Sequence, residues 1–300
     1  MKIGCAALYP ITRYGFPYTL DNYLKAVAEM HSAGFEYCEL EINVDNDLDE
    51  YIERTGEVER VLADNQMTVS AIIGVVDGAF STNPVIADAY LRKYEQLCRF
   101  GRGIHCDMIC ICAYMPPEIE GVAGTEPYSG APPMQVREPE DFDWDLFWDN
   151  AVHRFAQMAR ISAKYDQKLI IENRVGDWVS TSDGVLKLIE DAGEPNAGCL
   201  LDVAHTNATK EHLNLVIPKL KHRLMYVHLA DNDGTQPYHL PAGQGTIDFP
   251  SVFGSLESIG YDSYVNVDYG GVPSDQILEE VTKGRAYFQE CLETASQDHG

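Results

Sequence analysis

Four apolar stretches of this sequence end in a residue that can bind a metal ion. Three of these residues are carboxylates and one is an imidazole: Glu172, Asp202, His228 and Asp268. An oxygen-rich set with a single nitrogen suits octahedral divalent ions, with positions left for water or substrate oxygens. Without a cation, the gathered acids would repel one another and their pKa values would rise. The pattern predicts a divalent metal site, for which Mn²⁺ is the first choice and Mg²⁺ or Co²⁺ are alternatives.

The ligand candidates stand at the ends of strand-like runs that alternate with helical patterns. Several of these runs are almost continuously apolar, which is typical of parallel strands covered on both faces. Strands are expected over residues 2–9, 36–42, 68–76, 107–114, 168–173, 198–204, 224–230 and 263–268. Helices are expected over residues 19–33, 48–65, 84–102, 144–165, 181–191, 209–219, 249–258 and 274–293.

Eight alternating units without a linker predict one (β/α)₈ TIM barrel over residues 1–300. A doubly wound open sheet is the rival, but it needs a Gly-rich phosphate turn after the first strand, which residues 9–15 lack. In a barrel, the carboxyl ends of consecutive strands converge, so the four ligand candidates would surround one point. Residues 115–143 follow the fourth strand as a long loop on that face, and we expect a lid or a partner-docking loop there.

Composition excludes several classes of function. The 300 residues carry 22 Lys and Arg against 47 Asp and Glu, for a net charge of −25. Such a surface repels phosphate backbones and anionic lipid, so we expect neither nucleic acid nor a membrane as partner. No stretch approaches the roughly 18 to 20 apolar residues of a membrane span. The first residues lack the pattern of a secretory signal, so a cytoplasmic location is expected.

The cysteines, two further acids and two aromatic residues are interpreted as structural or substrate-binding groups. The eight cysteines sit mostly in apolar runs, where they act as small buried hydrophobes in a reducing compartment. Glu39 and Glu41, at the end of the second strand, are interpreted as solvated acids of the barrel rim. Tyr9 and Trp178 are candidates to line a sugar pocket, because aromatic rings stack on sugars and on aryl groups.

At these strand ends the sequence resembles the xylose isomerase-like barrels, a group of sugar isomerases and epimerases. The group has a strand-end Glu often followed by Asn, then Asp-x-x-His, then His on the next strand, and an acid on the last strand. Here these elements are Glu172-Asn173, Asp202-Val203-Ala204-His205, Val227-His228-Leu229-Ala230-Asp231-Asn232 and Val267-Asp268, with the loop 239–249 before the seventh barrel helix. The likeness spans the whole chain and is specific for the superfamily, although it does not specify a substrate.

The resemblance implies roles for individual residues. It places a divalent ion on Glu172, Asp202, His228 and Asp268, and it makes Glu172 and Asp268 the proton-exchanging carboxylates. His205, as a further catalytic group, and His239 and Asn232 would contact substrate hydroxyls or the groups around the ion. Asp268 stands where ketose 3-epimerases have a second glutamate, and Gly234 stands where they have a substrate-binding arginine. Both departures argue against simple 3-epimerisation of a free ketose, and Arg174 is a candidate to supply the missing cation.

The chemistry that follows is proton abstraction next to a carbonyl. A divalent ion stabilises the charge that develops on enolisation, while a carboxylate or imidazole removes the proton. Return of the proton to the other face gives an epimer, and return to a neighbouring carbon gives an isomer. The substrate would be a non-phosphorylated sugar or sugar derivative, because no Lys or Arg lies near the loop after the eighth strand.

Two alternatives remain open at this point. Catalytic subunits of C-glycoside deglycosidases share the barrel and the metal pattern, and eliminate an aglycone from a 3-oxo-glycoside together with a small β subunit. The other alternative is a carbohydrate-binding barrel without chemistry. The expected assembly is a homo-oligomer, or a hetero-oligomer with a β subunit in the lyase reading.

Overall fold

The apolar runs of the sequence form the strands of a closed parallel barrel. The computed structural model describes residues 1–126 and 133–298, and its barrel strands follow the order β1-β10-β9-β8-β7-β4-β3-β2. The strands are β1 (Lys2–Cys5), β2 (Tyr37–Asn43), β3 (Thr68–Val75), β4 (Met108–Cys112), β7 (Lys168–Glu172), β8 (Ala197–Asp202), β9 (Leu224–Leu229) and β10 (Tyr264–Val267). The predicted (β/α)₈ barrel is confirmed, and the open sheet is excluded.

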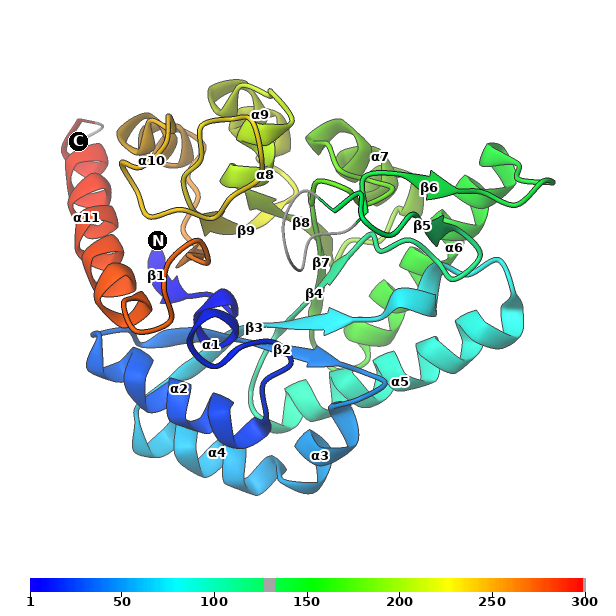
Figure 1. Ribbon diagram of the computed structural model, residues 1–300, viewed down its shortest axis with the longest axis horizontal. Helices are drawn as coiled ribbons and strands as arrows, with labels where there is room; N and C mark the ends of the chain where they lie inside the picture. The colour runs from blue at the N-terminus through cyan, green and yellow to red at the C-terminus, as the bar shows by residue number, and fades with distance from the viewer. Residues whose placement is uncertain (127–132, 299–300) are drawn as a thin grey trace.

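Helices surround the strands on the outside, as Figure 1 shows for α2, α4 and α5 along one side and α10 and α11 on the other. An apolar layer fills the space between helices and strands. The helices are α1 (Leu8–Tyr14), α2 (Leu20–Ser32), α3 (Leu48–Glu53), α4 (Thr55–Asp64), α5 (Pro84–Gly103), α6 (Trp144–Ala163), α7 (Ser182–Ala192), α8 (Val203–Ala208), α9 (Leu213–Leu220), α10 (Phe249–Ser258) and α11 (Ile277–Asp298), with a 3₁₀ turn η1 at Asp77–Phe80. Thr181 accepts a hydrogen bond from the Gly184 amide and so caps α7, as its position predicts.

The first strand is much shorter than predicted. Residues 2–9 were expected to be extended, but β1 ends at Cys5 and α1 begins at Leu8. Pro10 falls in the first turn of α1, where the missing N–H of proline costs no hydrogen bond. The strand prediction over 198–204 was likewise too long, because Asp202 caps α8 by accepting the His205 amide at 2.7 Å.

The long loop after β4 holds a second, small sheet. Its two strands, β5 (Glu120–Gly121) and β6 (Val136–Arg137), pair in the antiparallel sense. The predicted lid over 115–143 includes residues 127–132, which lie outside the described residues. The two ends of this segment are therefore held together by the pairing of β5 with β6.

The inside of the barrel is part apolar and part polar. Ala71, Ile73, Met108 and Ile170 are among the side chains that fill an apolar cluster there. Next to it lies a buried network of hydrogen bonds. Ser70 Oγ lies 2.6 Å from Tyr226 Oη. Asn266 Nδ2 donates to Tyr226 Oη at 2.6 Å and to Glu39 Oε1 at 3.0 Å. A Cβ on Gly4 would stand 2.3 Å from Asn266 Oδ1, so this neighbour of Asn266 has to be glycine. Through Glu39, this hydrogen-bond network reaches His228 at the strand ends.

The cysteines and the helices agree with two further expectations. All eight cysteines are free and buried, as their apolar surroundings predict. Within the described part of the chain, no helix combines the length and the apolar character that crossing a bilayer requires.

Candidate metal centre

The barrel brings the four strand-end side chains to one point at its carboxyl-terminal face. Glu172 is the last residue of β7, Asp202 is the last of β8, His228 lies in β9, and Asp268 follows β10. The register places Asp202 directly opposite His228 in the ladder. All four side chains are nearly inaccessible to solvent.

The centre of the group is the Nδ1 atom of His228. It lies 3.5 Å from Glu172 Oε1, 3.8 Å from Asp202 Oδ2 and 3.5 Å from Asp268 Oδ2. Ligands about 2.1 Å from one ion stand about 3 to 3.5 Å apart. Possible ligand atoms of Glu172, Asp202 and His228 lie within 4.8 Å of one another, whereas Asp268 approaches this group through His228 and His239. Nδ1 is also buried with no hydrogen-bond partner among the described residues. A lone pair facing three carboxylates fits a divalent ion, and so does the donor chemistry of the set.

A buried glutamate from the second strand orients the histidine, which corrects the sequence interpretation. Glu39 was expected to be a solvated rim acid, but it is 1% exposed and its Oε1 accepts from His228 Nε2 at 2.7 Å. Its other oxygen accepts the Ala7 amide at 3.0 Å. With its proton on Nε2, His228 presents the Nδ1 lone pair, and a carboxylate partner of this kind fixes a metal-binding tautomer.

Cys38, Glu39 and Leu40 of β2 are all buried, so alternation along this strand did not distinguish Glu39 from a solvated acid. The register between β2 and β3 shifts between Cys38 and Glu39. The Cys38 carbonyl is taken by the Ser70 hydroxyl at 3.0 Å. Ser70 of β3 is the extra residue at this shift, and Glu39 keeps its place in the alternation of β2.

His239 joins the same group from the loop after β9. Its Nε2 lies 3.2 Å from Asp202 Oδ2 and 3.3 Å from Asp268 Oδ2, the two oxygens that also face His228. Burial disfavours the charged ring, but the nearby Asp202 outweighs it and raises the pKa of His239 to about 9. His239 therefore suits a hydrogen-bond donor at the edge of the acid cluster.

Asp231 holds the loop that carries His239. Its Oδ1 accepts the amides of Asn232 and Ile247, and its Oδ2 accepts those of Gly243 and Gly245. We expect Asp231→Ala to lower the free energy of unfolding by about 2–4 kcal/mol, because four backbone amides lose a charged acceptor. Urea denaturation measures the change.

The exposed Asp233, two residues later, gives the matched control for this substitution. Its side chain accepts only from Thr235. Asp233→Ala should therefore change the free energy of unfolding by less than about 1 kcal/mol. Equal effects of the two substitutions would contradict the assignment of Asp231 as the anchor of the loop.

The hydrogen bonds of His205 fix its tautomer. The Val175 amide donates to His205 Nδ1 at 3.2 Å, so the ring proton of the neutral form is on Nε2. Burial lowers the pKa of His205 to about 4, which keeps the ring neutral near pH 7. Asp202, His205 and His239 bring possible ligand atoms within 4.8 Å of one another, as do Glu172, Asp202 and His228. Because Nε2 of His205 carries a proton, His205 suits a donor to substrate rather than a metal ligand.

Arg174 lies just beyond the acid cluster and is held by two neighbours. Its guanidinium pairs with Asp177 at 2.6 Å and lies over the Tyr114 ring, 4.4 Å from the centroid. Glu41 is only partly buried at the same mouth, and burial raises its pKa to about 7, against the attraction of Arg174. Burial likewise raises the pKa of Asp268 to about 7. Acids that hold protons this readily favour a cation in their midst.

Three predicted substrate contacts lie elsewhere in the structure. The Tyr9 side chain is buried between α1 and α2, and its hydroxyl donates to Glu29 at 2.7 Å. Asn232 uses its carboxamide to join its loop to α8, donating to the Ala204 carbonyl and accepting from Asn207. Trp178 packs against Phe80 and other aromatic rings beside α6. In the described part of the chain, no hydrogen bond or ring contact joins these three side chains to the four strand-end residues, whereas His205 and His239 come close to them.

A thiol that the sequence interpretation treated as inert lies against a ligand candidate. Cys112, the last residue of β4, donates from Sγ to Glu172 Oε2 at 3.0 Å. The other oxygen of this carboxylate is the one that faces His228. Cys112 therefore leaves Glu172 one oxygen for a cation.

Comparisons with known proteins agree with this architecture. A family model described as "Xylose isomerase-like TIM barrel" matches residues 27–291. An inosose dehydratase of Clostridium botulinum is 26% identical over 167 residues, covering 49% of this chain and 54% of that protein. A ketose 3-epimerase of Arthrobacter globiformis is 23% identical over 274 residues, covering 88% and 82%.

Solved structures give the same fold. The structure of an L-ribulose 3-epimerase has a TM-score of 0.76 at 19% identity, and the match covers 100% of this chain and 97% of the other. The chain spans about half the length of the first curated relatives that it matches. Identities this low carry the fold, and the activity has to be argued from the site.

Proposed function

The chain belongs to the xylose isomerase-like TIM barrel family, and from this premise we propose that it is a divalent-metal-dependent sugar epimerase or isomerase. It would abstract a proton next to the carbonyl of a non-phosphorylated sugar or sugar derivative. One observation carries the proposal: His228 Nδ1 is buried without a partner and faces oxygens of Glu172, Asp202 and Asp268. Relatives named as ketose 3-epimerase and L-ribulose 3-epimerase support the substrate class.

The ion, Mn²⁺ in the first instance, would be held by Glu172, Asp202, His228 and Asp268. When bound, it would stabilise the negative charge that develops on the sugar oxygen during enolisation. The remaining work falls to the side chains around it.

We expect the two outer carboxylates to transfer the proton on opposite sides of a bound sugar. Glu172 belongs to β7 and Asp268 follows β10, so strands β8 and β9 stand between them. One carboxylate can remove the proton from one face of a carbon while the other returns it to the opposite face. This arrangement suits inversion of a stereocentre.

The histidines and Arg174 supply the hydrogen bonds. His205 offers its Nε2–H to the oxygen that becomes negative, as a neutral donor that keeps its proton. His239 and Arg174 would bind sugar hydroxyls from the rim. Asp177 and Tyr114 hold the guanidinium of Arg174 in place for this contact.

Deuterium exchange tests the proposal directly. The Mn²⁺-loaded protein is incubated in D₂O with free ketoses and, in a parallel sample, with a 3-oxo-glycoside. We expect deuterium at the carbon next to the carbonyl, because proton removal precedes every outcome of the enolate. Mass spectrometry and NMR locate the label.

Chelation provides the control for the same experiment. Removal of divalent ions with EDTA should stop the exchange, and added Mn²⁺ should restore it. Undiminished exchange in the chelated protein would overturn the metal dependence. Release of the aglycone from the 3-oxo-glycoside would select the lyase alternative, in which the deprotonated intermediate expels a leaving group.

A further inference from the structure

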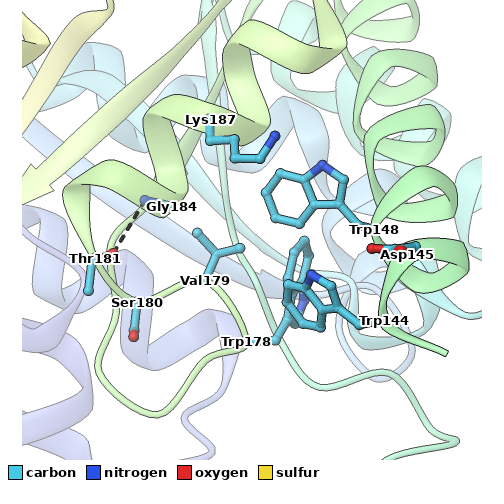
Figure 2. Close-up of a pocket in the computed structure, with 9 residues that line it drawn as sticks. All are labelled: Trp144, Asp145, Trp148, Trp178, Val179, Ser180, Thr181, Gly184 and Lys187. Carbon is cyan, nitrogen blue, oxygen red and sulfur yellow. Dashed lines mark hydrogen bonds between the residues drawn. The ribbon is translucent and has the colours of Figure 1, made fainter. Parts of the chain in front are cut away.

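All three tryptophans of the chain gather around one pocket, away from the strand-end acids. The pocket has a volume of about 480 Å³ and lies between α6 and the loop that leads into α7. Figure 2 shows the indole rings of Trp144, Trp148 and Trp178 side by side on one wall. The residues that line it are Trp144, Asp145, Trp148, Trp178, Val179, Ser180, Thr181, Gly184 and Lys187. None of them belongs to the candidate metal centre.

The three indole rings differ in exposure: Trp178 is packed against other aromatic rings, and Trp144 is exposed to solvent. Trp178 packs edge-on against Phe80 and Phe147, with ring centroids 5.1 and 5.2 Å apart. Trp144 and Trp148 lie with their ring planes 32° apart and their centroids 5.9 Å apart. Trp144 is 50% exposed, which is unusual for so large an apolar ring and leaves a stacking face available.

Polar groups surround this aromatic wall. Trp148 Nε1 donates to Asp191 Oδ2 at 2.8 Å, and Lys187 pairs with the same oxygen at 2.5 Å. Asp145 and Ser180 complete the polar rim. The indole N–H of Trp178 is buried without a hydrogen-bond partner in the described part of the chain, and a buried unpaired donor favours a ligand with oxygen acceptors.

Charge narrows the class of ligand. The rim holds two carboxylates and one ammonium on a chain of net charge −25, so an anion is repelled. A cationic ligand is also disfavoured, because the Lys187 ammonium already lies over the Trp148 ring, 4.8 Å from its centroid. A neutral ligand with a flat apolar face and a polar edge remains, and a pyranose ring has that shape.

We propose that this pocket is a second carbohydrate site that binds a neutral pyranose ring by stacking on the exposed ring of Trp144. Lys187, Asp145 and Ser180 then hydrogen-bond the ring hydroxyls. The proposal stands on the pocket alone and does not require the metal centre. Trp178 shares the loop after β7 with Arg174, so the two sites are joined by one short segment.

Intrinsic fluorescence is a specific reporter of this site, since no tryptophan lies anywhere else in the chain. The metal-free protein is titrated with methyl β-glucoside, cellobiose and maltose, and separately with phenol and glycerol. We expect a saturable change in emission with at least one saccharide, with a Kd on the order of 1–10 mM. Calorimetric titration gives an independent Kd.

Two variants on one helix provide the control. Trp144→Ala should weaken saccharide binding by about tenfold in the calorimetric titration, because the exposed stacking face is lost. Leu146→Ala should leave it unchanged, since Leu146 is also on α6 and 70% exposed but does not line this pocket. Both variants should bind Mn²⁺ like the wild type.

Three results would overturn the proposal. The first is no change in emission with any saccharide, and the second is binding of phenol alone, which would mark an aryl site. The third is saccharide binding that Trp144→Ala leaves intact. Each can occur whether or not the deuterium-exchange experiment succeeds, so failure of this site is distinguishable from failure of the proposed activity.

Discussion

Asp202→Asn is expected to weaken Mn²⁺ binding by more than about 100-fold and to lower turnover by at least about a thousandfold. Asp202 Oδ2 lies 3.8 Å from His228 Nδ1 and 3.2 Å from His239 Nε2, so it stands inside the ligand cluster. Its Oδ1 caps α8 through the His205 amide. Asparagine keeps an oxygen for the cap and loses only the charge. Calorimetric titration with Mn²⁺ and the deuterium-exchange rate measure the two effects.

Asp143→Asn is the matched control for this substitution. Asp143 caps α6 by accepting the Leu146 amide at 3.0 Å, and no hydrogen bond or ion pair of the described residues joins it to the ligand candidates. It should leave both metal affinity and exchange unchanged. Normal Mn²⁺ affinity in the folded Asp202→Asn variant would rule out the proposed ligand set, and circular dichroism would show that the variant is folded.

Glu39→Gln is expected to weaken Mn²⁺ binding by about 10- to 100-fold, although Glu39 does not reach the ion. Glu39 is the acceptor that keeps the His228 proton on Nε2. A glutamine can turn its NH₂ group toward Nε2, and the ring proton then moves to Nδ1, where it blocks the lone pair. The visible absorption spectrum of the Co²⁺-loaded protein should change as well, because it depends on the nitrogen ligand.

Glu41→Gln separates this effect from a simple loss of charge near the ion. Glu41 lies two residues further along β2, and no hydrogen bond joins its carboxylate to His228 among the described contacts. It should keep Mn²⁺ affinity within a few-fold of the wild type. If both variants lose affinity equally, long-range charge rather than histidine orientation governs the site.

The barrel was predictable because every level of the sequence agrees on it. Runs such as Met108–Cys112 and Ala197–Asp202 are buried along their whole length, and such runs occur in parallel strands covered on both faces. The convergence of Glu172, Asp202, His228 and Asp268 follows from the barrel itself, since strand ends meet on one face.

The contacts between distant segments could not be predicted in the same way. Glu39 alternates with Leu40 as a surface acid would, and only the partner 189 residues away, His228, shows why it is buried. Tyr9 follows an apolar strand, and the short α1 that turns its ring toward Glu29 left no strong periodic signal. Trp178 was expected to form a stacking wall of the sugar pocket. In the structure its ring packs against Phe80 of η1 and Phe147 of α6.

The barrel closes through a seam between its first and last strands. Lys2 pairs with Tyr264 and Cys5 pairs with Val267, and Asp268 follows at once. During synthesis β1 emerges first and β10 last among the barrel strands, so the pairing that closes the barrel also brings in Asp268, the third acid. A chain interrupted before β10 would have an open sheet with unpaired edges at β1 and β9. The same truncation would remove Asp268, so closure of the barrel and completion of the proposed ligand set depend on the same last strand.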